Sequence, residues 1–290
     1  MSDDSRIVQD VTEIIKYTIY SDYLVIDKDA HEAVLSAIIV APVEHGKTSI
    51  LMQFQPTDGL LCMTNLTAYG LQHKYLKQLR SGSIKRVVVP DFINPANQKQ
   101  ETVNSLITFF NSYISWEGVG NIVSYAITLT LTTNLTGGLL TTMAVLDFQR
   151  MKKVLAATGF LSRLLVVGYQ DSRQKVQEIL LSIARGEVVW NKYNLPVPKE
   201  QVAVSMENEL SEKLIPLAVS IGRRAYGDGF RAIHQLKVMC RAKALSEGRD
   251  EVCQEDVDRV LWLADNYIGR VPHSKPQYRD YPELARTGGN

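Results

Sequence analysis

The chain has 290 residues, a length that suits one core domain with a smaller satellite. Its composition, 45% hydrophobic and 22% charged, is ordinary for a globular protein, and a formal net charge of +1 neither indicates nor excludes a nucleic-acid partner. Three cysteines without metal-ligand spacing argue against a disulfide framework. The polar, acidic N-terminus and the lack of any apolar run near the roughly 20 residues of a membrane helix predict a cytoplasmic protein with no membrane association.

In chain order, residues 1–30 are expected to form an N-terminal helix over Ile7–Tyr20 and a short strand over Tyr23–Ile26. Residues 31–190 then alternate buried runs with helical stretches, the pattern of a parallel sheet with helices on both faces. The five predicted strands are Ala37–Val40, Leu60–Met63, Val87–Val89, Ala126–Thr133 and Leu164–Val167. The predicted helices of this α/β core are Ser49–Phe54, Leu71–Arg80, Thr102–Ser115, Leu146–Ala157 and Ser172–Ala184.

The pattern of strands alternating with helices ends after residue 190. Residues 191–202 are rich in turn-forming residues and predict a linker. Residues 203–268 predict a small all-helical domain, and residues 269–290 predict a tail. The three helices expected in the helical domain are Val204–Arg224, Phe230–Ser246 and Gln254–Tyr267.

A phosphate-binding loop is predicted directly after the first buried strand. Gly46-Lys47-Thr48 matches the end of the P-loop pattern, although Ala41 stands where that pattern has its first glycine. Such a loop presents backbone N–H groups and a helix N-terminus to phosphates, while the lysine reaches the terminal phosphates and the threonine hydroxyl ligates Mg²⁺. The predicted ATP-binding residues are Ala41, Pro42, Val43, Glu44, His45, Gly46, Lys47, Thr48 and Ser49.

The alternative is a chance Gly-Lys-Thr tripeptide in an ordinary loop. The position between a buried strand and a helix favours the nucleotide interpretation. Two side chains in the loop need a special explanation. Glu44 would repel phosphates unless it points away, and His45 is expected to face solvent rather than to act in catalysis.

A second carboxylate follows the strand Val87–Val89. Asp91 is predicted to join Thr48 in binding Mg²⁺, the alternative being a helix-capping aspartate. Phe92 follows it, where many such enzymes have a glutamate that polarises the attacking water. Glu117 and Glu101 are candidates for that role, and a surface turn explains Glu117 equally well.

The order of these elements resembles an AAA+ ATPase. The resemblance implies a polar residue, called sensor 1, at the tip of the strand that lies between the phosphate loop and the metal-binding strand. Asn134, or alternatively Thr133, would fill that role after the strand predicted at Ala126–Thr133. The alternative is an asparagine in a turn before Gly137-Gly138.

Gly159-Phe160-Leu161-Ser162-Arg163 resembles the arginine-finger segment of minichromosome-maintenance-type AAA+ helicases, and also a string found in uncharacterised ATPases of phages and integrated elements. The resemblance implies that Arg163 reaches the γ-phosphate of ATP bound to a neighbouring subunit. A guanidinium there stabilises the negative charge of phosphoryl transfer. A surface arginine in an ion pair is the alternative.

The helical domain extends the resemblance. Phe230-Arg231-Ala232-Ile233 is similar to the lid helix of the same helicases, which implies that Arg231 is sensor 2, ahead of Arg223 or Arg224. The resemblance covers residues 31–268. The chain departs from it at Ala41 and Phe92, and residues 1–30 are expected to be too few to form the oligonucleotide-binding domain of those helicases.

The resemblance implies an ATP- and Mg²⁺-dependent homo-oligomer, a ring that could be a hexamer, acting on DNA in phage or mobile-element replication in the host cytoplasm. The alternative is a nucleotide-dependent switch or helicase loader with slow hydrolysis and a protein partner. A basic stretch could meet DNA phosphates or could be a solvated helix face: Lys74, Lys77, Arg80, Lys85 and Arg86.

Overall fold

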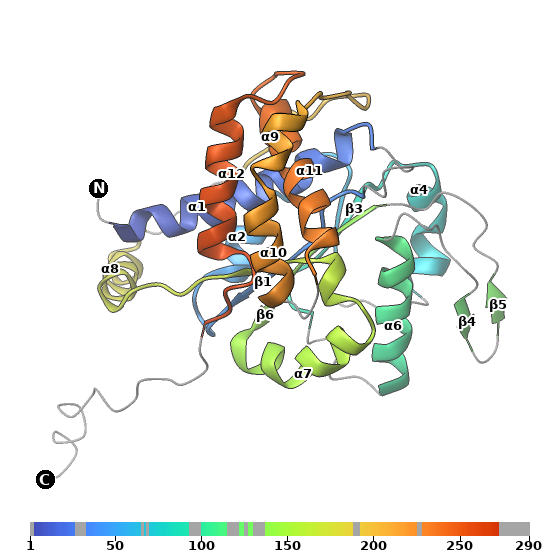
Figure 1. Cartoon of the computed structure of the whole chain (residues 1–290). Coiled ribbons are helices and arrows are strands. Elements are labelled where there is room, and N and C mark those ends of the chain that lie inside the picture. The colour runs from blue at the N-terminus through green and yellow to red at the C-terminus, as the bar shows by residue number, and fades with distance from the viewer. Residues whose placement is uncertain are drawn as a thin grey trace, which may run out of the picture.

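The structure is a computed structural model that describes residues 3–26, 33–64, 67, 70–92, 100–114, 122–124, 127–129, 137–187, 192–224 and 228–272. Its centre is a five-stranded, all-parallel sheet with the order β2-β3-β6-β1-β7, which confirms the predicted α/β class (Figure 1). The strands are β1 (Ala37–Ala41), β2 (Leu60–Cys62), β3 (Arg86–Val89), β6 (Gly138–Ala144) and β7 (Leu165–Gly168).

The strand order creates a switch point beside β1. The chain runs from β1 to β2 on one side of the sheet, and it later crosses from β6 over β1 to reach β7 on the other side. In open α/β sheets the crevice at such a point, beyond the carboxyl ends of the strands, is where ligands bind. The loop after β1 therefore begins at the position that this fold favours for a site.

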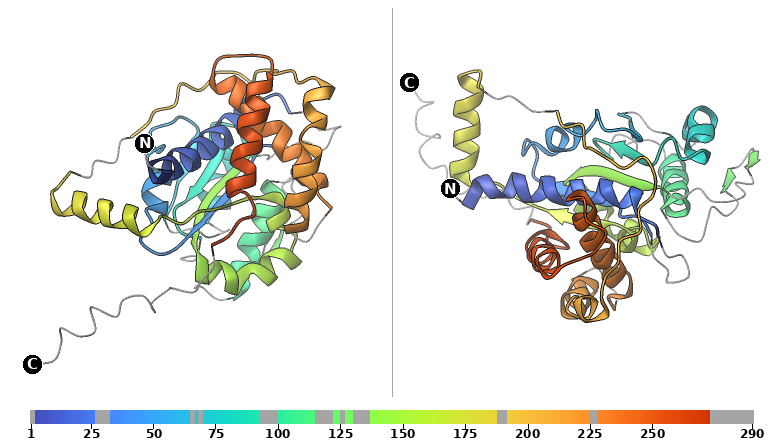
Figure 2. Two further views of the ribbon diagram at one scale, coloured as in Figure 1. Left: turned by 60° about the vertical axis from the view of Figure 1, so that its left-hand side comes forward. Right: turned by 90° about the horizontal axis from the view of Figure 1, so that it is seen from above.

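Helices cover both faces of the sheet because successive strand residues point to opposite sides. On one face, Ile39 packs with α1 (Asp3–Tyr20), α2 (Lys47–Met52) and helices of the C-terminal region. On the other face, Ile38 and Val40 pack with further helices (Figures 1 and 2). These are the π-helical turn η2 (Leu71–Tyr75) with α4 (Leu76–Arg80), α6 (Gln100–Tyr113) and α7 (Val145–Ala157).

The N-terminal helix α1 contacts both β6 and the C-terminal helices α11 and α12. Its buried Asp10 accepts hydrogen bonds from Arg259 and from the Tyr267 hydroxyl, the latter at 2.8 Å. The first and last helices of the described chain are thereby fastened together across 249 sequence positions.

The C-terminal region is all-helical, as predicted: α9 (Asn208–Glu212), α10 (Ile215–Arg224), α11 (Phe230–Ser246) and α12 (Gln254–Tyr267). The single helix predicted over Val204–Arg224 is wrong in its first part. Val204 lies outside any helix, and Pro216 in the first turn of α10 prevents continuation from α9, since proline lacks the N–H that an α-helix requires and clashes with the preceding turn.

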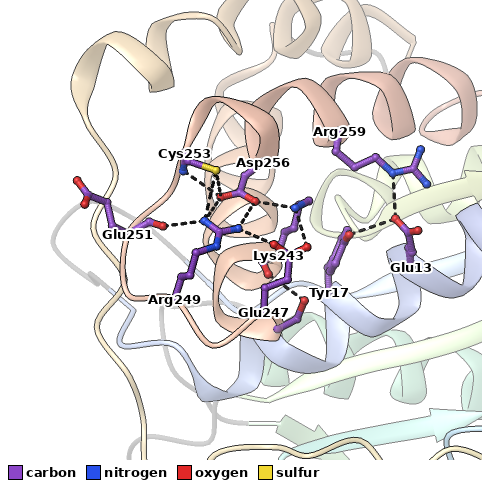
Figure 3. A network of polar contacts seen from close by, with 10 residues as sticks. Glu13, Tyr17, Lys243, Glu247, Arg249, Glu251, Cys253, Asp256 and Arg259 are labelled. Atoms are coloured by element: carbon purple, nitrogen blue, oxygen red, sulfur yellow. Dashed lines mark hydrogen bonds and ion pairs between the residues drawn. The ribbon is translucent and has the colours of Figure 1, made fainter.

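A buried carboxylate organises the start of α12 (Figure 3). Asp256 has no exposed surface and accepts hydrogen bonds from Lys243 Nζ at 2.7 Å, from both Nη atoms of Arg249 at 2.6 and 2.7 Å, and from the backbone N–H of Cys253 at 2.9 Å. Glu247 accepts from the same lysine and arginine at 2.8 and 2.6 Å. The network joins α11 to α12 and caps the N-terminus of α12.

A second buried ion pair joins the start of β3 to the turn that follows α1. Arg86, at the start of β3, is fully buried and donates two 2.8 Å hydrogen bonds to Asp22 and one of 2.6 Å to the carbonyl of Thr18. Burial raises the pKa of Asp22 to about 6, while the guanidinium acts in the opposite direction. Arg86 is therefore a structural residue, and the expectation that it could meet DNA phosphates is wrong.

Two predicted strands differ from the structure. Of the strand expected at Ala126–Thr133, the structure describes residues 127–129, which lie outside the main sheet as β5 and pair antiparallel with β4 (Ile122–Ser124). The sheet position between β3 and β1 belongs to β6. Tyr23–Ile26 is also not a strand, since Ser21–Tyr23 form a 3-10 turn and Leu24 makes one bridge to Val202.

The remaining helix, α8 (Arg173–Ala184), follows β7 and stands away from the body of the molecule in all three views (Figures 1 and 2). Leu180, Leu181 and Ile183 on this helix are each more than half exposed. No helix in the described ranges is long and apolar enough to cross a membrane.

Candidate functional site

The predicted phosphate loop lies at the carboxyl end of β1. Ala41 is the last residue of this fully buried strand, and α2 begins at Lys47. Because Ala41 packs in the core below the loop, its methyl group takes no part in lining the loop itself. The strand, loop and helix are thus arranged as the nucleotide interpretation requires.

The backbone of the loop contains two left-handed residues. Gly46, which caps the N-terminus of α2, has φ of 70°, and Glu44 has φ of 67°. A left-handed conformation is inexpensive for glycine but costs a residue with a Cβ atom roughly 1 kcal/mol or more. The Glu44 side chain is exposed and the neighbouring Val43 is 66% exposed, so the carboxylate lies on the outside of the molecule.

Lys47 folds back over its own loop. Its Nζ donates a 2.5 Å hydrogen bond to the carbonyl of Pro42 at the opposite end of the loop. Burial lowers the pKa of Lys47, and the Asp91 carboxylate opposes that shift. The ammonium therefore lies within the curve of the loop, where a phosphate would replace the Pro42 carbonyl as its partner.

The predicted metal-binding residues meet beside the carbonyl of Pro90. The hydroxyl of Thr48 donates to this carbonyl at 3.4 Å, and Asp91 is the next residue along the chain, with an exposed side chain. The hydroxyl of Thr48 and the carboxylate on the residue after Pro90 are oxygen ligands of the kind that Mg²⁺ prefers. The structure thus brings Lys47, Thr48 and Asp91 to one edge of the sheet.

Thr142 on β6 is a neighbour of this group that the sequence prediction missed. Its hydroxyl also donates to the Pro90 carbonyl, and its backbone carbonyl accepts from the N–H of Phe92 at 3.0 Å. β6 lies between β1 and β3, so Thr142 is a polar residue on the strand at whose end sensor 1 was expected. The unassigned run between Gly137 and Leu146 was the signal that could have revealed this strand.

Several predicted residues lie outside the described residues. These are Glu117, Asn134 and Thr133, together with the side chain of Glu101, so their proposed roles stay predictions. The structure does describe Phe92, the residue beside Asp91. Phe92 is buried and stacks on Phe160 with ring centroids 5.8 Å apart, so it serves the hydrophobic core.

His45 is not the solvent-facing residue that the sequence analysis expected. Its side chain is 15% exposed, and its Nδ1 lies 3.0 Å from Oδ2 of the buried Asp171. The carbonyl of His45 accepts a hydrogen bond from the hydroxyl of Tyr169. Both partners follow β7, more than 120 residues further along the chain, a separation at which no local sequence pattern could have indicated the contact.

The two predicted arginines lie together on another part of the surface. Arg163 ends the short 3-10 turn η3 (Leu161–Arg163) and donates to the carbonyl of Gly159 at 2.8 Å. Arg231, in the first turn of α11, donates to the hydroxyl of Ser162. Arg224, the alternative to Arg231, instead binds Asp265 at 3.1 Å.

A cavity of about 290 Å³ lies next to this pair of arginines, between α7, η3 and the C-terminal helices. Its lining is largely apolar and includes Phe148, Leu164 and Ile221, with Arg231 among the polar residues. Phe230, at the edge of the cavity, is 77% exposed. The cavity lining contains no residue of the phosphate loop, so this is a separate surface feature.

No family model matches the chain, and no curated protein matches it. Among solved structures, the fold is similar to that of a full-length MCM homologue from Methanopyrus kandleri, with a TM-score of 0.47 and 13% sequence identity. The similarity covers 88% of this chain and 54% of that one, so the chain spans about half the length of the MCM homologue. This level of similarity assigns no role to any residue, and the chemistry of the site rests on its own geometry.

Proposed function

We propose that this protein binds ATP with Mg²⁺ in the loop between β1 and α2 and hydrolyses it. The observation that carries the proposal is the convergence of Lys47, Thr48 and Asp91 at the carboxyl edge of a parallel sheet, beside its switch point. Each of the three has the chemistry that a phosphate or a magnesium ion requires. A Gly-Lys-Thr tripeptide that occurred by chance in an ordinary loop would not be expected to lie beside Asp91 at the carboxyl edge of a parallel sheet.

The roles of the three residues follow from their positions. Lys47 would exchange the Pro42 carbonyl for phosphate oxygens, and the backbone N–H groups at the start of α2 would hold the same phosphates. The Thr48 hydroxyl and the Asp91 carboxylate would hold Mg²⁺, directly or through water. The bound ion would neutralise charge on the phosphates, which is the main contribution of a metal in phosphoryl transfer.

The surface that carries Arg163 and Arg231, called here the arginine surface, supports the proposal of an oligomer. Arg231 donates to the hydroxyl of Ser162, the residue before Arg163. We propose that Arg163 serves the ATP of a neighbouring copy, as the resemblance to AAA+ proteins implies. A head-to-tail assembly that closes would form a ring. In this proposal each site takes Lys47, Thr48 and Asp91 from one copy and Arg163 from the next.

We further propose that the assembly acts on DNA in the replication of a phage or mobile element. This extension rests on the resemblance of Gly159–Arg163 to helicase and phage ATPase segments. Lys74 and Lys77 are exposed and could contact phosphates, although the Lys74 ammonium lies 5.3 Å from the centre of the Tyr75 ring. The Lys85 ammonium lies 4.5 Å from the centre of the Tyr23 ring.

A second function is favoured by one observation. Phe92 occupies a buried aromatic cluster where a catalytic glutamate would be expected, so hydrolysis could be slow and ATP could act mainly to order an assembly. This alternative is a nucleotide-dependent switch or helicase loader with a protein partner.

The two functions are separated by measuring ATP hydrolysis at several protein concentrations, with and without single- and double-stranded DNA, using Lys47→Ala as the control. A motor predicts turnover that rises with DNA and with protein concentration. A switch predicts ATP binding, an ATP-dependent change of oligomeric state and little turnover. If the wild-type chain and Lys47→Ala bind and hydrolyse ATP equally, both functions are wrong.

A further inference from the structure

The phosphate loop is attached to the end of β7 at two atoms of a single residue. His45 contacts the Asp171 carboxylate through Nδ1 at 3.0 Å, and its backbone carbonyl accepts from the hydroxyl of Tyr169. Burial raises the pKa of Tyr169, so its hydroxyl stays protonated and can donate at any physiological pH. A loop residue held at both its side chain and its backbone cannot rotate without losing one of these contacts.

Two atoms of Asp171 lie near Nδ1 of His45, the carboxylate Oδ2 and the backbone N, and each requires a different tautomer of the imidazole. If Nδ1 carries the proton, it donates to Oδ2. If Nδ1 is bare, it accepts from the backbone N–H of Asp171 at 3.2 Å. In the second case the buried carboxylate would face a lone pair, and its other oxygen, Oδ1, has no hydrogen-bond partner. Because an unpaired buried carboxylate costs more than an unpaired N–H, the Nδ1–H form is favoured.

The loop needs such an attachment because of its backbone. His45 lies between Glu44 and Gly46, and both are in the left-handed conformation. A non-glycine residue holds that conformation only where its surroundings impose it. Nothing in the Glu44 side chain supplies the constraint, since it is exposed to solvent. Two sets of contacts bear on this backbone: Lys47 closes the loop onto the Pro42 carbonyl, and His45, between the two left-handed residues, is held to Asp171 and Tyr169.

We propose that the contact of His45 with Asp171 and Tyr169 is a latch that holds the phosphate loop in its phosphate-binding shape before the ligand arrives. His45 is a positioning residue, which acts on phosphate through the conformation of Glu44 and Gly46. The ligand in this inference comes from the proposed function, whereas the latch itself is a property of the empty loop.

The latch also links two parts of the proposed site. Tyr169 and Asp171 lie just beyond one end of β7, and Arg163 lies just before the other end. β7 pairs with β1 over four residues and is buried throughout. The loop that would bind one ATP is thereby fixed to the strand that follows the predicted arginine finger of the same copy.

The test uses three variants of the full chain and two readouts. His45→Leu removes the latch, His45→Asn keeps an N–H donor near the position of Nδ1, and Glu44→Gly combined with His45→Leu removes the strain that the latch opposes. The exposed His73→Leu is the matched control, and melting curves check that each variant folds. The readouts are hydrogen exchange of the loop amides without nucleotide, and the affinity for ATP with Mg²⁺.

We expect faster loop exchange and roughly tenfold weaker ATP binding in His45→Leu, the loss that follows from removing one charge-assisted hydrogen bond. His45→Asn should stay within about threefold of the wild type, and Glu44→Gly should recover part of the loss, since glycine adopts the left-handed conformation unaided. Where turnover is measurable, KM should rise more than kcat falls.

Unchanged loop exchange in His45→Leu would overturn the latch, whatever happens to ATP binding. Faster exchange with unchanged ATP affinity would overturn its positioning role. Failure of Glu44→Gly to recover any affinity would show that His45 acts on the ligand by another route and would also overturn the proposal. If the wild type binds no ATP, the proposed function fails, and hydrogen exchange still decides whether the latch exists.

Discussion

Asp256 shows how much one carboxylate contributes to the helical region (Figure 3). Burial raises the pKa of this group, but hydrogen bonds from Arg249, Lys243 and the backbone of Cys253 more than offset burial and hold the pKa far below its usual range. The folded protein therefore keeps Asp256 ionised where an unfolded chain would protonate it. This difference in pKa raises the free energy of unfolding at neutral pH.

We expect Asp256→Asn to lower the free energy of unfolding by about 3 kcal/mol at pH 7, because it leaves the buried Lys243 and the partly exposed Arg249 with only the exposed carboxylate of Glu247. A carboxyl with a depressed folded pKa contributes fully above its unfolded value of about 4 and loses that contribution as the pH falls. Urea unfolding between pH 7 and pH 3 should therefore show a smaller acid-induced loss in the variant.

Asp265 provides the control for this prediction. It also pairs with two arginines, Arg224 and Arg270, but its side chain is 52% exposed. Asp265→Asn should change the free energy of unfolding by less than about 1 kcal/mol, as exposed pairs do. Equal losses in the two variants would contradict the role assigned to the buried network.

Thr48 is predicted to act through the metal. Thr48→Ala should weaken binding of ATP with Mg²⁺ roughly tenfold and change binding of ATP in a chelator by much less, since its hydroxyl is expected to contact the ion. Thr48→Ser keeps the hydroxyl and should keep the Mg²⁺ dependence. Calorimetric titration with and without Mg²⁺ measures both, and an equal loss under the two conditions would remove Thr48 from the metal site.

At the scale of single residues, the sequence predicts the role of a residue when the residues that define this role lie close to it in the chain. Lys47 and Thr48 are recognisable because a short motif and its flanking strand are contiguous. His45 was misjudged because its partner, Asp171, is 126 positions away, and no pattern within the loop reports a contact at that distance. Arg86 was misjudged for the same reason, as its buried partner Asp22 belongs to another element.

At the scale of elements, four of the predicted helices agree closely with the structure, whereas two predicted strands do not. α6, α7, α11 and α12 begin and end within a few residues of the prediction. The run at Ala126–Thr133 has strand-forming composition, which does not distinguish a strand of the main sheet from one in a separate antiparallel pair. β6 was overlooked because its two threonines, Thr141 and Thr142, interrupt an otherwise apolar run.

β6 begins at a glycine that the ion pair of Arg86 requires. A Cβ atom at Gly138 would lie 2.2 Å from Cζ of Arg86. Gly138→Ala must therefore displace a buried guanidinium from Asp22, and we expect it to lower the free energy of unfolding by about 3 kcal/mol. Gly70→Ala is the control, because its Cβ would meet a single hydroxyl at 3.0 Å, and urea unfolding should show a change below about 1 kcal/mol.

Similar losses for the two glycine variants would mean that Arg86 can move freely, which would contradict its role as the buried partner of Asp22. A loss confined to Gly138→Ala would confirm that close packing at the start of β6 fixes the ion pair. Gly138→Ala should affect stability alone, since Arg86 lies at the opposite end of β3 from Asp91.

At the scale of the whole molecule, the phosphate loop and the arginine surface are separate features of one copy. The cavity beside Arg231 is lined by α7, η3 and the C-terminal helices and by no loop residue. Separate placement is what a site shared between copies requires. α1 holds the helical region against the sheet through Asp10, so movement of that region would involve the N-terminal helix as well.

A shared site predicts complementation. Arg163→Ala should leave ATP binding nearly intact and abolish turnover, and Lys47→Ala should abolish binding. Mixed assemblies contain some interfaces with a normal loop and a normal arginine, so mixing the two inactive variants should restore part of the turnover. Absence of any recovery across all mixing ratios would contradict a finger that acts on a neighbouring copy.

The measurement that tests the central claim most directly is a titration of the wild-type chain and Lys47→Ala with ATP in the presence of Mg²⁺. We predict saturable binding by the wild type and an affinity roughly 10- to 100-fold weaker in the variant, the loss expected for a charge-assisted hydrogen bond to phosphate. Equal affinities, or no binding by a correctly folded wild type, would contradict the assignment of the β1–α2 loop as a nucleotide site.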